Sequence, residues 1–428
     1  MVSRAVAERK VLSVRGAALG TGAVSLTART RVALITPWHP EPVDNGSKQR
    51  IAQLIAALAP DYDIVLISLL TADEQAGAPP SSVPGVYRQC VLTLPSYRPR
   101  SAKALLAGLH PLPRSFAVTW DRTTAMQLNA IVRSMGIGLA LGADLRILHY
   151  LLDLPAGIPI VIDEMNTSPF LADEARGGTF ARLRAAGRQR KYARFLGQAV
   201  RQLDAAVVSS VYEAAAYRQL AGTAQVTLIE NGVGAVPESP WHPIDSTQLL
   251  YNGALSYAPN AEAVEYFLGD ILPLIAPTAP SIHLLVTGKI PSAGHPARAH
   301  PQVRLSGWLD RDELDAAYRA SRVCIAPLLS GTGTRIKLLE ALAYGLPVVT
   351  TTKGAEGLDV ISGEHLIIAD TPAEFAAATV RLLTDDDAAR QLGARGREHV
   401  RQRYSWDTRG VQLRGLVRDC LNSASTGG

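Results

Sequence analysis

The chain has 428 residues, which is too many for one ordinary hydrophobic core, and its 47% hydrophobic and 19% charged residues are typical of a globular protein. The formal net charge of +5 is modest, so we expect no nucleic-acid partner. Three cysteines far apart in the sequence (Cys90, Cys324 and Cys420) argue against a disulfide framework and a zinc site, and for a reducing compartment.

Residues 1–30 carry five basic residues and one acid, and Gly or Arg interrupts every apolar run of a possible secretory signal. The composition is compatible with a transit peptide, but we expect an extension without ordered structure. Elsewhere no apolar run approaches the roughly 18 residues of a membrane-spanning helix, and we therefore expect a cytoplasmic protein.

In the first half of the chain, apolar runs of strand length alternate with segments of helical periodicity. The predicted helices include Lys48–Leu58 and a long region over Phe180–Leu203. The predicted strands are Arg31–Thr36, Ile64–Leu70, Val86–Leu94, Leu145–His149, Ile158–Asp163, Ala205–Ser209 and Val226–Ile229. This alternation is typical of a parallel sheet covered by helices.

The alternation starts again after a Pro-rich stretch. The predicted elements are strands Leu249–Gly253, Ile282–Thr287, Val303–Leu305 and Val323–Leu328, with helices Ala261–Leu272 and Asp312–Ala320. We therefore predict an α/β fold of two doubly wound, Rossmann-like parallel-sheet domains that face each other across a cleft. The predicted domains are residues 31–235 and 248–405, joined by a hinge at 236–247, with a C-terminal helix and tail at 406–428 that crosses back to the first domain.

The most informative segment is 327–350, PLLSGTGTRIKLLEALAYGLPVVT. It predicts a strand, a Gly-rich loop, a helix that Thr334 caps and Gly345 ends, and a further strand. Arg335 and Lys337 stand in the first helical turn, where the helix dipole disfavours cations and no acid accompanies them. A helix start with free N–H groups and two cations predicts a site for a phosphate or diphosphate.

Glu340 follows in the same helix, among residues that are apolar on nearly every face. A buried carboxylate needs partners, for which Lys337 and a pair of ligand hydroxyls are candidates. The alternative is a surface helix with an ordinary Lys337–Glu340 ion pair, which leaves the loop glycines and the misplaced cations unexplained.

The segment Gly331–Thr350 closely resembles the donor-binding motif of the group 1 glycosyltransferases, which are retaining, sugar-nucleotide-dependent enzymes of the GT-B fold. The resemblance runs over nearly the whole chain from about Arg31. Further segments resemble family segments in the same order: VIDEMN at 161–166, IENGV at 229–233, YNGALSYAPN at 251–260, KGAEGL at 353–358 and RYSWD at 403–407. Each is weak alone, and their number and order make the match specific.

The resemblance implies transfer of a hexose from a nucleoside diphosphate sugar to a saccharide or lipid-linked hydroxyl, with the acceptor on the first domain and the donor on the second. Glu340 would accept hydrogen bonds from the ribose hydroxyls. Arg335 and Lys337 would support the leaving diphosphate. The remaining donor-loop residues implied are Gly331, Thr332, Gly333 and Thr334, of which the last two would offer backbone N–H groups.

Other implied positions lie in the first domain. Gly46 belongs to a Gly-rich loop that would approach the donor phosphates or the acceptor, and its alternative is a turn residue before a helix. His149 would contact the transferred sugar if it ends a strand at the cleft, and its alternative is an ordinary core or surface histidine. Glu164 and Asn166 would line the acceptor side, with helix capping as their alternative.

The chain departs from the family at two places. Many relatives carry a glutamate eight positions before the second one, and here that position is Thr332. Many also place cations after the first strand of the second domain, and Leu255 to Asn260 contains none. Arg335 and Lys337 would then carry the diphosphate nearly alone.

No metal ion or other cofactor is expected, because the Asp310-Arg-Asp312 triplet is better explained as a helix cap than as a metal motif. From Arg176 to Arg201 there are eight Lys or Arg and no acid, so peripheral contact with an anionic membrane is possible, with a solvated helix face as the alternative. The alternative functions are a sugar-nucleotide epimerase or phosphorylase of similar fold, and a non-catalytic sugar-nucleotide or glycan binding protein.

Overall fold

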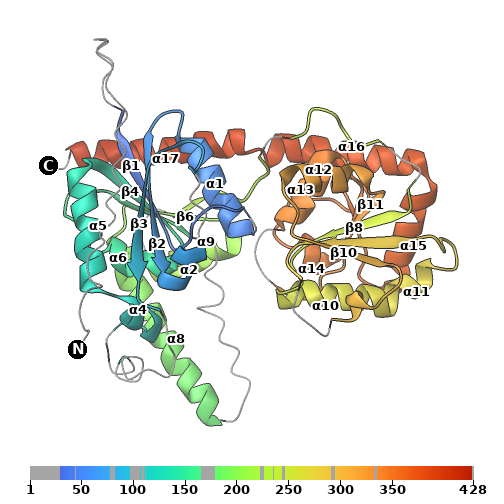
Figure 1. Cartoon of the computed structure of the whole chain (residues 1–428), viewed down its shortest axis with the longest axis horizontal. Coiled ribbons are helices and arrows are strands. Elements are labelled where there is room, and N and C mark those ends of the chain that lie inside the picture. Colours follow the sequence, from blue (N-terminus) through green and yellow to red (C-terminus); the bar gives the residue numbers. More distant parts are fainter. Residues whose placement is uncertain are drawn as a thin grey trace, which may run out of the picture.

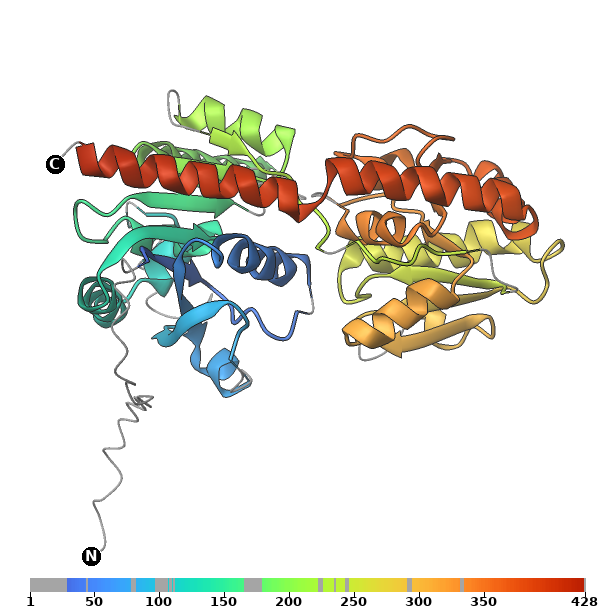
Figure 2. The same cartoon turned by 90° about the horizontal axis from the view of Figure 1, so that it is seen from above.

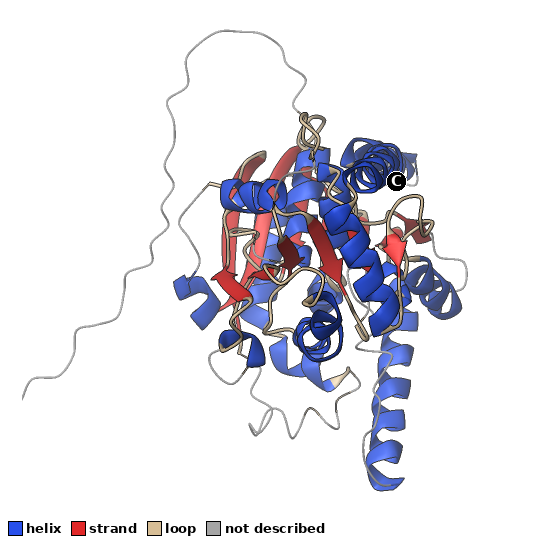
Figure 3. Ribbon diagram, turned by 90° about the vertical axis from the view of Figure 1, so that its right-hand side faces the viewer, coloured by secondary structure: helices blue, strands red, loops and turns tan. Residues whose placement is uncertain are grey.

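The computed structural model describes residues 29–426 apart from 44, 78–81, 97–106, 108–109, 111, 165–178, 222–225, 235, 243–245, 291–294 and 332–334. The predicted extension at residues 1–30 therefore lies almost wholly outside the described residues. The described chain forms two α/β units side by side, each with a sheet between layers of helices (Figures 1 and 3).

The first unit is a seven-stranded parallel sheet in the order β3-β2-β1-β4-β5-β6-β7. Its strands are β1 (Arg31–Thr36), β2 (Asp63–Thr71), β3 (Val86–Leu94), β4 (Ile137–Ala143), β5 (Ile160–Glu164), β6 (Ala205–Val208) and β7 (Val226–Leu228). Its helices are α1 (Gly46–Leu58), α2 (Ala72–Gly77), α4 (Arg114–Thr119), α5 (Arg122–Ser134), α6 (Leu148–Leu151), α8 (Thr179–Val200) and α9 (Val211–Ala221). Central strands such as β1 are buried on both faces, which explains their nearly unbroken apolar sequence.

The second unit is a six-stranded parallel sheet in the order β10-β9-β8-β11-β12-β13. Its strands are β8 (Gln248–Asn252), β9 (His283–Thr287), β10 (Val303–Gly307), β11 (Val323–Ala326), β12 (Val348–Thr350) and β13 (Ile367–Ile368). Its helices are α10 (Ala258–Tyr266), a π-helical turn Phe267–Ile271, α11 (Leu272–Ile275), α12 (Arg311–Ala320), α13 (Ile336–Tyr344), α14 (Thr352–Ala355), α15 (Pro372–Thr384) and α16 (Asp386–Arg403). The predicted α/β class with two parallel sheets is confirmed.

The predicted strand Leu145–His149 is wrong. The strand is β4, and Leu145–Ile147 form a 3-10 turn that leads into α6. The sequence of β4 contains Gly138 and Gly142, which weaken a strand pattern, but Gly142 is required by packing. A Cβ added there would lie 2.2 Å from Cδ1 of Leu151, so α6 packs closely against the strand only because this position has no side chain.

The chain crosses between the units twice, and the two crossings are hydrogen-bonded to each other. The amide of Val233 donates to the carbonyl of Tyr404 (2.9 Å), and the amide of Trp406 donates to the carbonyl of Val233 (3.1 Å). Gly232 allows this approach, because an added Cβ would lie 2.3 Å from the carbonyl oxygen of Tyr404. The connection is thus a paired, two-strand hinge.

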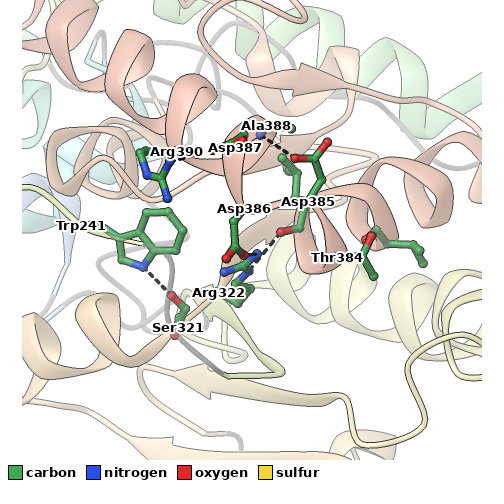
Figure 4. Close-up of polar contacts among 11 residues, drawn as sticks. Trp241, Ser321, Arg322, Thr384, Asp385, Asp386, Asp387, Ala388 and Arg390 are labelled. Atoms are coloured by element: carbon green, nitrogen blue, oxygen red, sulfur yellow. Dashed lines mark hydrogen bonds and ion pairs between the residues drawn. The ribbon is translucent and has the colours of Figure 1, made fainter.

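The first crossing is anchored to the second unit by Trp241 (Figure 4). Its buried indole N–H donates to the carbonyl of Ser321 (2.8 Å), and its backbone N–H donates to the carbonyl of Tyr344 (2.7 Å). Next to Ser321, the buried Arg322 pairs with Asp386 at the start of α16. The Asp385–Asp387 run thus begins a helix, with Asp385 as its N-cap.

The last helix, α17 (Trp406–Thr426), follows α16 and covers the first unit rather than the second (Figure 2). Its apolar side chains Trp406, Leu413, Leu416, Val417 and Cys420 share one hydrophobic core with α1 and with strands of the first sheet. The C-terminal helix therefore ties the two units together on the side that carries the hinge.

Candidate active site

The site is built at the carboxyl end of β8, where α13 begins. Seven of the nine α13 residues are buried, so the surface-helix alternative is wrong. The helix begins one residue later than predicted: Arg335, and not Thr334, occupies the N-cap position, and its side chain makes no cap hydrogen bond. Gly345 ends the helix at φ +83°, the left-handed geometry that favours glycine. Thr332, Gly333 and Thr334 lie outside the described residues.

Glu340 is buried, with 8% of its surface exposed, and hydrogen bonds reach both of its oxygens. Its Oε2 accepts from the hydroxyl of Tyr318 (3.1 Å) and the amide of Asn252 (3.3 Å). Its Oε1 accepts from the amide of Gln49 (2.9 Å) and lies 3.7 Å from Nη1 of Arg311. Burial raises the pKa of Glu340, while Gln49, Arg311 and Tyr318 oppose that rise. The carboxylate is therefore held in place by neutral donors and one exposed arginine.

The partners of Oε2 are themselves fixed. Asn252 donates to the hydroxyl of Tyr318 (2.9 Å) and accepts from the hydroxyl of Thr287 (2.8 Å). Tyr318 stacks on Tyr344 at a centroid distance of 4.6 Å, and burial raises its pKa well above the ordinary value. Tyr318 therefore stays protonated and acts only as a donor to Glu340 or an acceptor from Asn252. This network orients the Glu340 carboxylate within the second unit.

Lys337 does not pair with Glu340, contrary to one candidate from the sequence. Its Nζ donates to Oδ1 of Asn260 (2.7 Å) and to the hydroxyl of Tyr251 (3.1 Å), and it lies 4.4 Å from the centroid of the Tyr251 ring. Among the described residues it forms no ion pair with a carboxylate. Burial and the neighbouring Arg335 lower the pKa of Lys337 to about 7. A desolvated ammonium with only neutral partners favours an incoming anion.

Arg335 is buried and lies under the loop that follows β11. Its guanidinium donates to the carbonyls of Gly331 (3.0 Å) and Ser330 (3.3 Å), and burial lowers its pKa. Gly331 has φ +92°, and an added Cβ would lie 3.1 Å from Pro259. A Cβ on Gly253, next to Asn252, would lie 2.6 Å from Nζ of Lys337. Both cations thus lie against the segments after β8 and β11, where the sequence lacks cations of its own.

The first unit contributes the start of α1. Gly46 is the first residue of that helix, which Asn45 caps by accepting from the amide of Lys48 (3.0 Å). A Cβ on Gly46 would lie 3.2 Å from Cδ1 of Ile336 at the start of α13. One helical turn later, Gln49 reaches Glu340. The two helix starts therefore meet across the interface between the units, on the sides that face each other in Figure 1.

His149 lies in α6 and not at the end of a strand, so the geometric reason for placing it at a cleft does not hold. It is buried among aromatic rings, 5.2 Å from Phe116 and 4.5 Å from Tyr150 between centroids. Among the described residues neither ring nitrogen has a hydrogen-bond partner, and burial lowers the pKa of His149 to about 3. The ring is thus neutral, and its role toward a sugar stays a prediction.

The acceptor-side candidates are only partly described. Glu164 ends β5, but its side chain lies outside the described residues, as does all of Asn166. In the basic region, α8 projects from the first unit (Figure 1), while Tyr192, Phe195 and Leu196 of its second half are buried in the core. Within the described part of the chain, no helix is both long and apolar enough to span a membrane.

A metal site was not expected, and the described residues contain no group of three or more His, Cys, Asp or Glu placed to hold a metal ion. Asp310 forms a capping box with Glu313 at the start of α12, as the capping interpretation of the Asp310-Arg-Asp312 triplet predicts.

Sequence reasoning missed the donors that surround Glu340: Gln49, Asn252, Arg311 and Tyr318. No short spacing links them, because they lie between 22 and 291 positions from Glu340. The available signal was indirect. Gln49 lies at the start of the predicted helix that follows the Gly46 loop, and Asn252 lies at the carboxyl end of the first strand of the second unit, where parallel sheets bind ligands.

The family model for group 1 glycosyl transferases matches residues 246–385, which is the second unit with the site around α13. A phosphatidyl-myo-inositol mannosyltransferase of Mycobacterium leprae is 29% identical over 46% of this chain and 54% of its own length. A glycogen synthase of Mycobacterium tuberculosis is 32% identical over 44% of this chain and 47% of its own length. The matched region thus spans about half the length of these curated relatives.

Solved structures match over a larger part of the chain. A sucrose-phosphate synthase of Thermosynechococcus elongatus has a TM-score of 0.65 at 20% identity and covers 92% of this chain and 100% of its own. Anabaena HepE, solved with UDP and glucose, has a TM-score of 0.60 at 12% identity and covers 91% of this chain and 99% of its own. At these sequence identities, the structural similarity establishes the fold alone.

Residues 246–385 thus match the model of the group 1 glycosyl transferases, and the described chain has the GT-B fold of two facing parallel-sheet units.

Proposed function

We propose that this chain is a retaining glycosyltransferase that moves a hexose from a nucleoside diphosphate sugar to a hydroxyl of a saccharide or lipid-linked acceptor. The observation that carries the proposal is the start of α13. There a desolvated lysine without a described carboxylate partner lies one helical turn from a buried carboxylate, both at the end of β8. In a nucleoside diphosphate, the anionic diphosphate fits the lysine and the ribose diol fits the carboxylate.

In this proposal Lys337 and Arg335 hold the diphosphate, and Oε1 of Glu340 accepts from a ribose hydroxyl. The bond between the sugar C1 and the diphosphate oxygen breaks, and the acceptor oxygen forms a bond to C1 from the same face. The acceptor proton passes to the departing phosphate oxygen. Negative charge grows on the diphosphate as the bond breaks, so two desolvated cations beside it stabilise the transition state more than the ground state. No metal ion is needed for this step.

The acceptor belongs on the first unit, where His149, Glu164 and Asn166 remain the predicted contacts. Curated relatives that match part of this chain include proteins named as a phosphatidyl-myo-inositol mannosyltransferase and as a glycogen synthase. Their names support a lipid-linked or saccharide hydroxyl as the acceptor class.

The decisive experiment titrates the purified chain with UDP-, GDP-, ADP- and dTDP-sugars by calorimetry and then measures nucleotide release with candidate acceptors. We expect one nucleotide to bind and release to depend on the acceptor, with the anomeric configuration of the donor retained in the product by NMR. Turnover of the donor without any acceptor would instead indicate an epimerase. Binding without turnover, across a broad acceptor panel, would indicate a non-catalytic binding protein.

A further inference from the structure

Gln49 connects the two units through the residue that is proposed to bind ribose. Its amide, on α1 of the first unit, donates to Oε1 of Glu340 on α13 of the second unit at 2.9 Å. We propose that Gln49 is a latch of the donor site: without nucleotide it holds the two units together through Oε1, and it must leave before a ribose hydroxyl can take that oxygen. The second part of this inference rests on the proposed function.

The two oxygens of Glu340 have different environments, and this difference selects Oε1 for the ligand. Oε2 is held by Tyr318 and Asn252, both of which belong to the second unit and move with Glu340. Oε1 has one hydrogen-bond donor within 3.0 Å, Gln49, and that donor belongs to the other unit. Arg311 lies farther away, at 3.7 Å, and its side chain is 61% exposed. Separation of the units therefore exposes Oε1 and leaves Oε2 in place.

Gln49 is held rigidly enough to act as a latch. The next residue, Arg50, is buried and donates two hydrogen bonds to the carboxylate of Asp163 (2.6 and 2.7 Å). Arg50 also donates to Oδ1 of Asn231 (2.7 Å) and to the carbonyl of Ile229 (3.0 Å), in the turn that opens the hinge. The start of α1 is thus fixed to both the first sheet and the hinge, so the backbone of Gln49 moves with the first unit.

The contact has the strength expected of a latch that a substrate can release. It is one hydrogen bond to a carboxylate, next to the close approach of Gly46 to Ile336, where an added Cβ would lie 3.2 Å from Cδ1. Hydrogen bonds to charged groups contribute more than neutral ones, yet a ribose diol offers Glu340 the same kind of bond in return. Nucleotide binding then exchanges one partner of Oε1 for another, and the buried carboxylate always has a donor.

The first test needs no ligand. Small-angle X-ray scattering should show a larger radius of gyration for Gln49→Ala than for the parent chain, and a larger one still for Gln49→Glu, which places a second carboxylate against Glu340. Gln202→Ala is the matched control, because the exposed Gln202 bonds to the carbonyl of Gln198 at the end of α8, before β6 begins. Identical scattering of all four proteins, each shown to be folded by its thermal transition, would overturn the latch.

The second test measures competition with the ribose. We expect the nucleotide that binds the parent chain to bind Gln49→Ala about tenfold more tightly, a factor equivalent to about 1.4 kcal/mol. Weaker binding by Gln49→Ala would overturn the competition, since Gln49 would then contact the nucleotide. If no nucleotide binds either protein, the proposed function fails and the ribose competition fails with it, while the scattering still decides whether Gln49 holds the units together.

Discussion

Lys337 is a buried cation whose charge state depends on pH and on whether an anion is bound. Its pKa is lowered to about 7 by burial and by Arg335, whereas an unfolded lysine titrates near 10.4. Between about pH 7 and 10.4 the unfolded chain therefore binds more protons at this position than the folded chain. Its contribution to the free energy of unfolding rises with pH across that window.

We therefore predict that Lys337→Met flattens the rise of stability between pH 7 and about 9, measured by urea denaturation at each pH. Donor affinity should change with pH in the opposite direction, because the diphosphate binds the ammonium form of Lys337. In the parent chain the affinity for a nucleotide sugar should fall by up to about tenfold per pH unit above pH 7, and calorimetry should detect proton uptake. The Met variant should bind weakly at every pH; a pH slope like that of the parent would show that another group is responsible.

Burial of the Glu340 carboxylate disfavours the folded state, and the same carboxylate is proposed to bind ribose. Its pKa is raised because burial disfavours the charged form, so the carboxylate does not improve the fold in the way that an apolar residue would. We predict that Glu340→Ala lowers donor affinity by about 2–3 kcal/mol, the size of lost hydrogen bonds to a charged group, while the chain stays folded.

Glu340→Gln is the matched variant for that prediction, because it keeps the volume and removes the charge. Calorimetry should show a loss of donor affinity of the same order, and thermal unfolding should show a melting temperature equal to or above that of the parent. Nucleotide affinity close to the parent value in either variant would contradict the ribose assignment.

At the scale of elements, the Arg50–Asp163 ion pair joins α1 to β5 and to the hinge turn. Both side chains are almost fully buried, at 1% and 0% exposure, and the guanidinium also lies 5.7 Å from the ring of Trp406 on α17. Such a pair is costly to break, because a single substitution leaves one buried charge without its partner.

We predict that Arg50→Met and Asp163→Asn each lower the free energy of unfolding by about 3–5 kcal/mol, measured by urea denaturation. The double variant Arg50→Met with Asp163→Asn should be less destabilised than the sum of the two single variants, because it leaves no buried charge alone. Additive effects of the two changes would show that packing, rather than the charge pair, makes these positions sensitive.

At the scale of the whole molecule, the paired crossings of the hinge determine how the two units stand to each other. Gly232→Ala would place a methyl group 2.3 Å from the carbonyl oxygen of Tyr404, which no rotation of a side chain relieves. We predict that this variant has a lower melting temperature and a changed radius of gyration, because the crossings must separate.

Gly187→Ala is the control for the hinge, since an added Cβ there meets nothing within 4 Å. In the middle of α8 it should leave the protein unchanged or stabilise it by about 0.5–1 kcal/mol. Equal effects of the two substitutions on melting temperature and scattering would refute a specific role of Gly232 in the hinge.

The sequence by itself determined the elements whose signals are local. The strands β1, β2 and β11 are buried apolar runs, and the end of α13 follows from Gly345. The proposal of an anion site at the start of α13 rests on two cations without an acid. These features depend on neighbours within one helical turn or one strand, so they can be read from consecutive residues. The order of family-like segments then predicted the pairing of two parallel-sheet units.

Only the tertiary structure decided which side chains meet. The run at Leu145–His149 has the composition of a strand, yet it forms a turn and helix because β4, in which close packing requires Gly142, fills that place in the sheet. Lys337 donates a hydrogen bond to Asn260 rather than pairing with Glu340. Glu340 accepts a hydrogen bond from Gln49, which lies 291 positions away in the sequence. Such contacts depend on how the two units pack across the hinge, and no local pattern in the sequence encodes that distance.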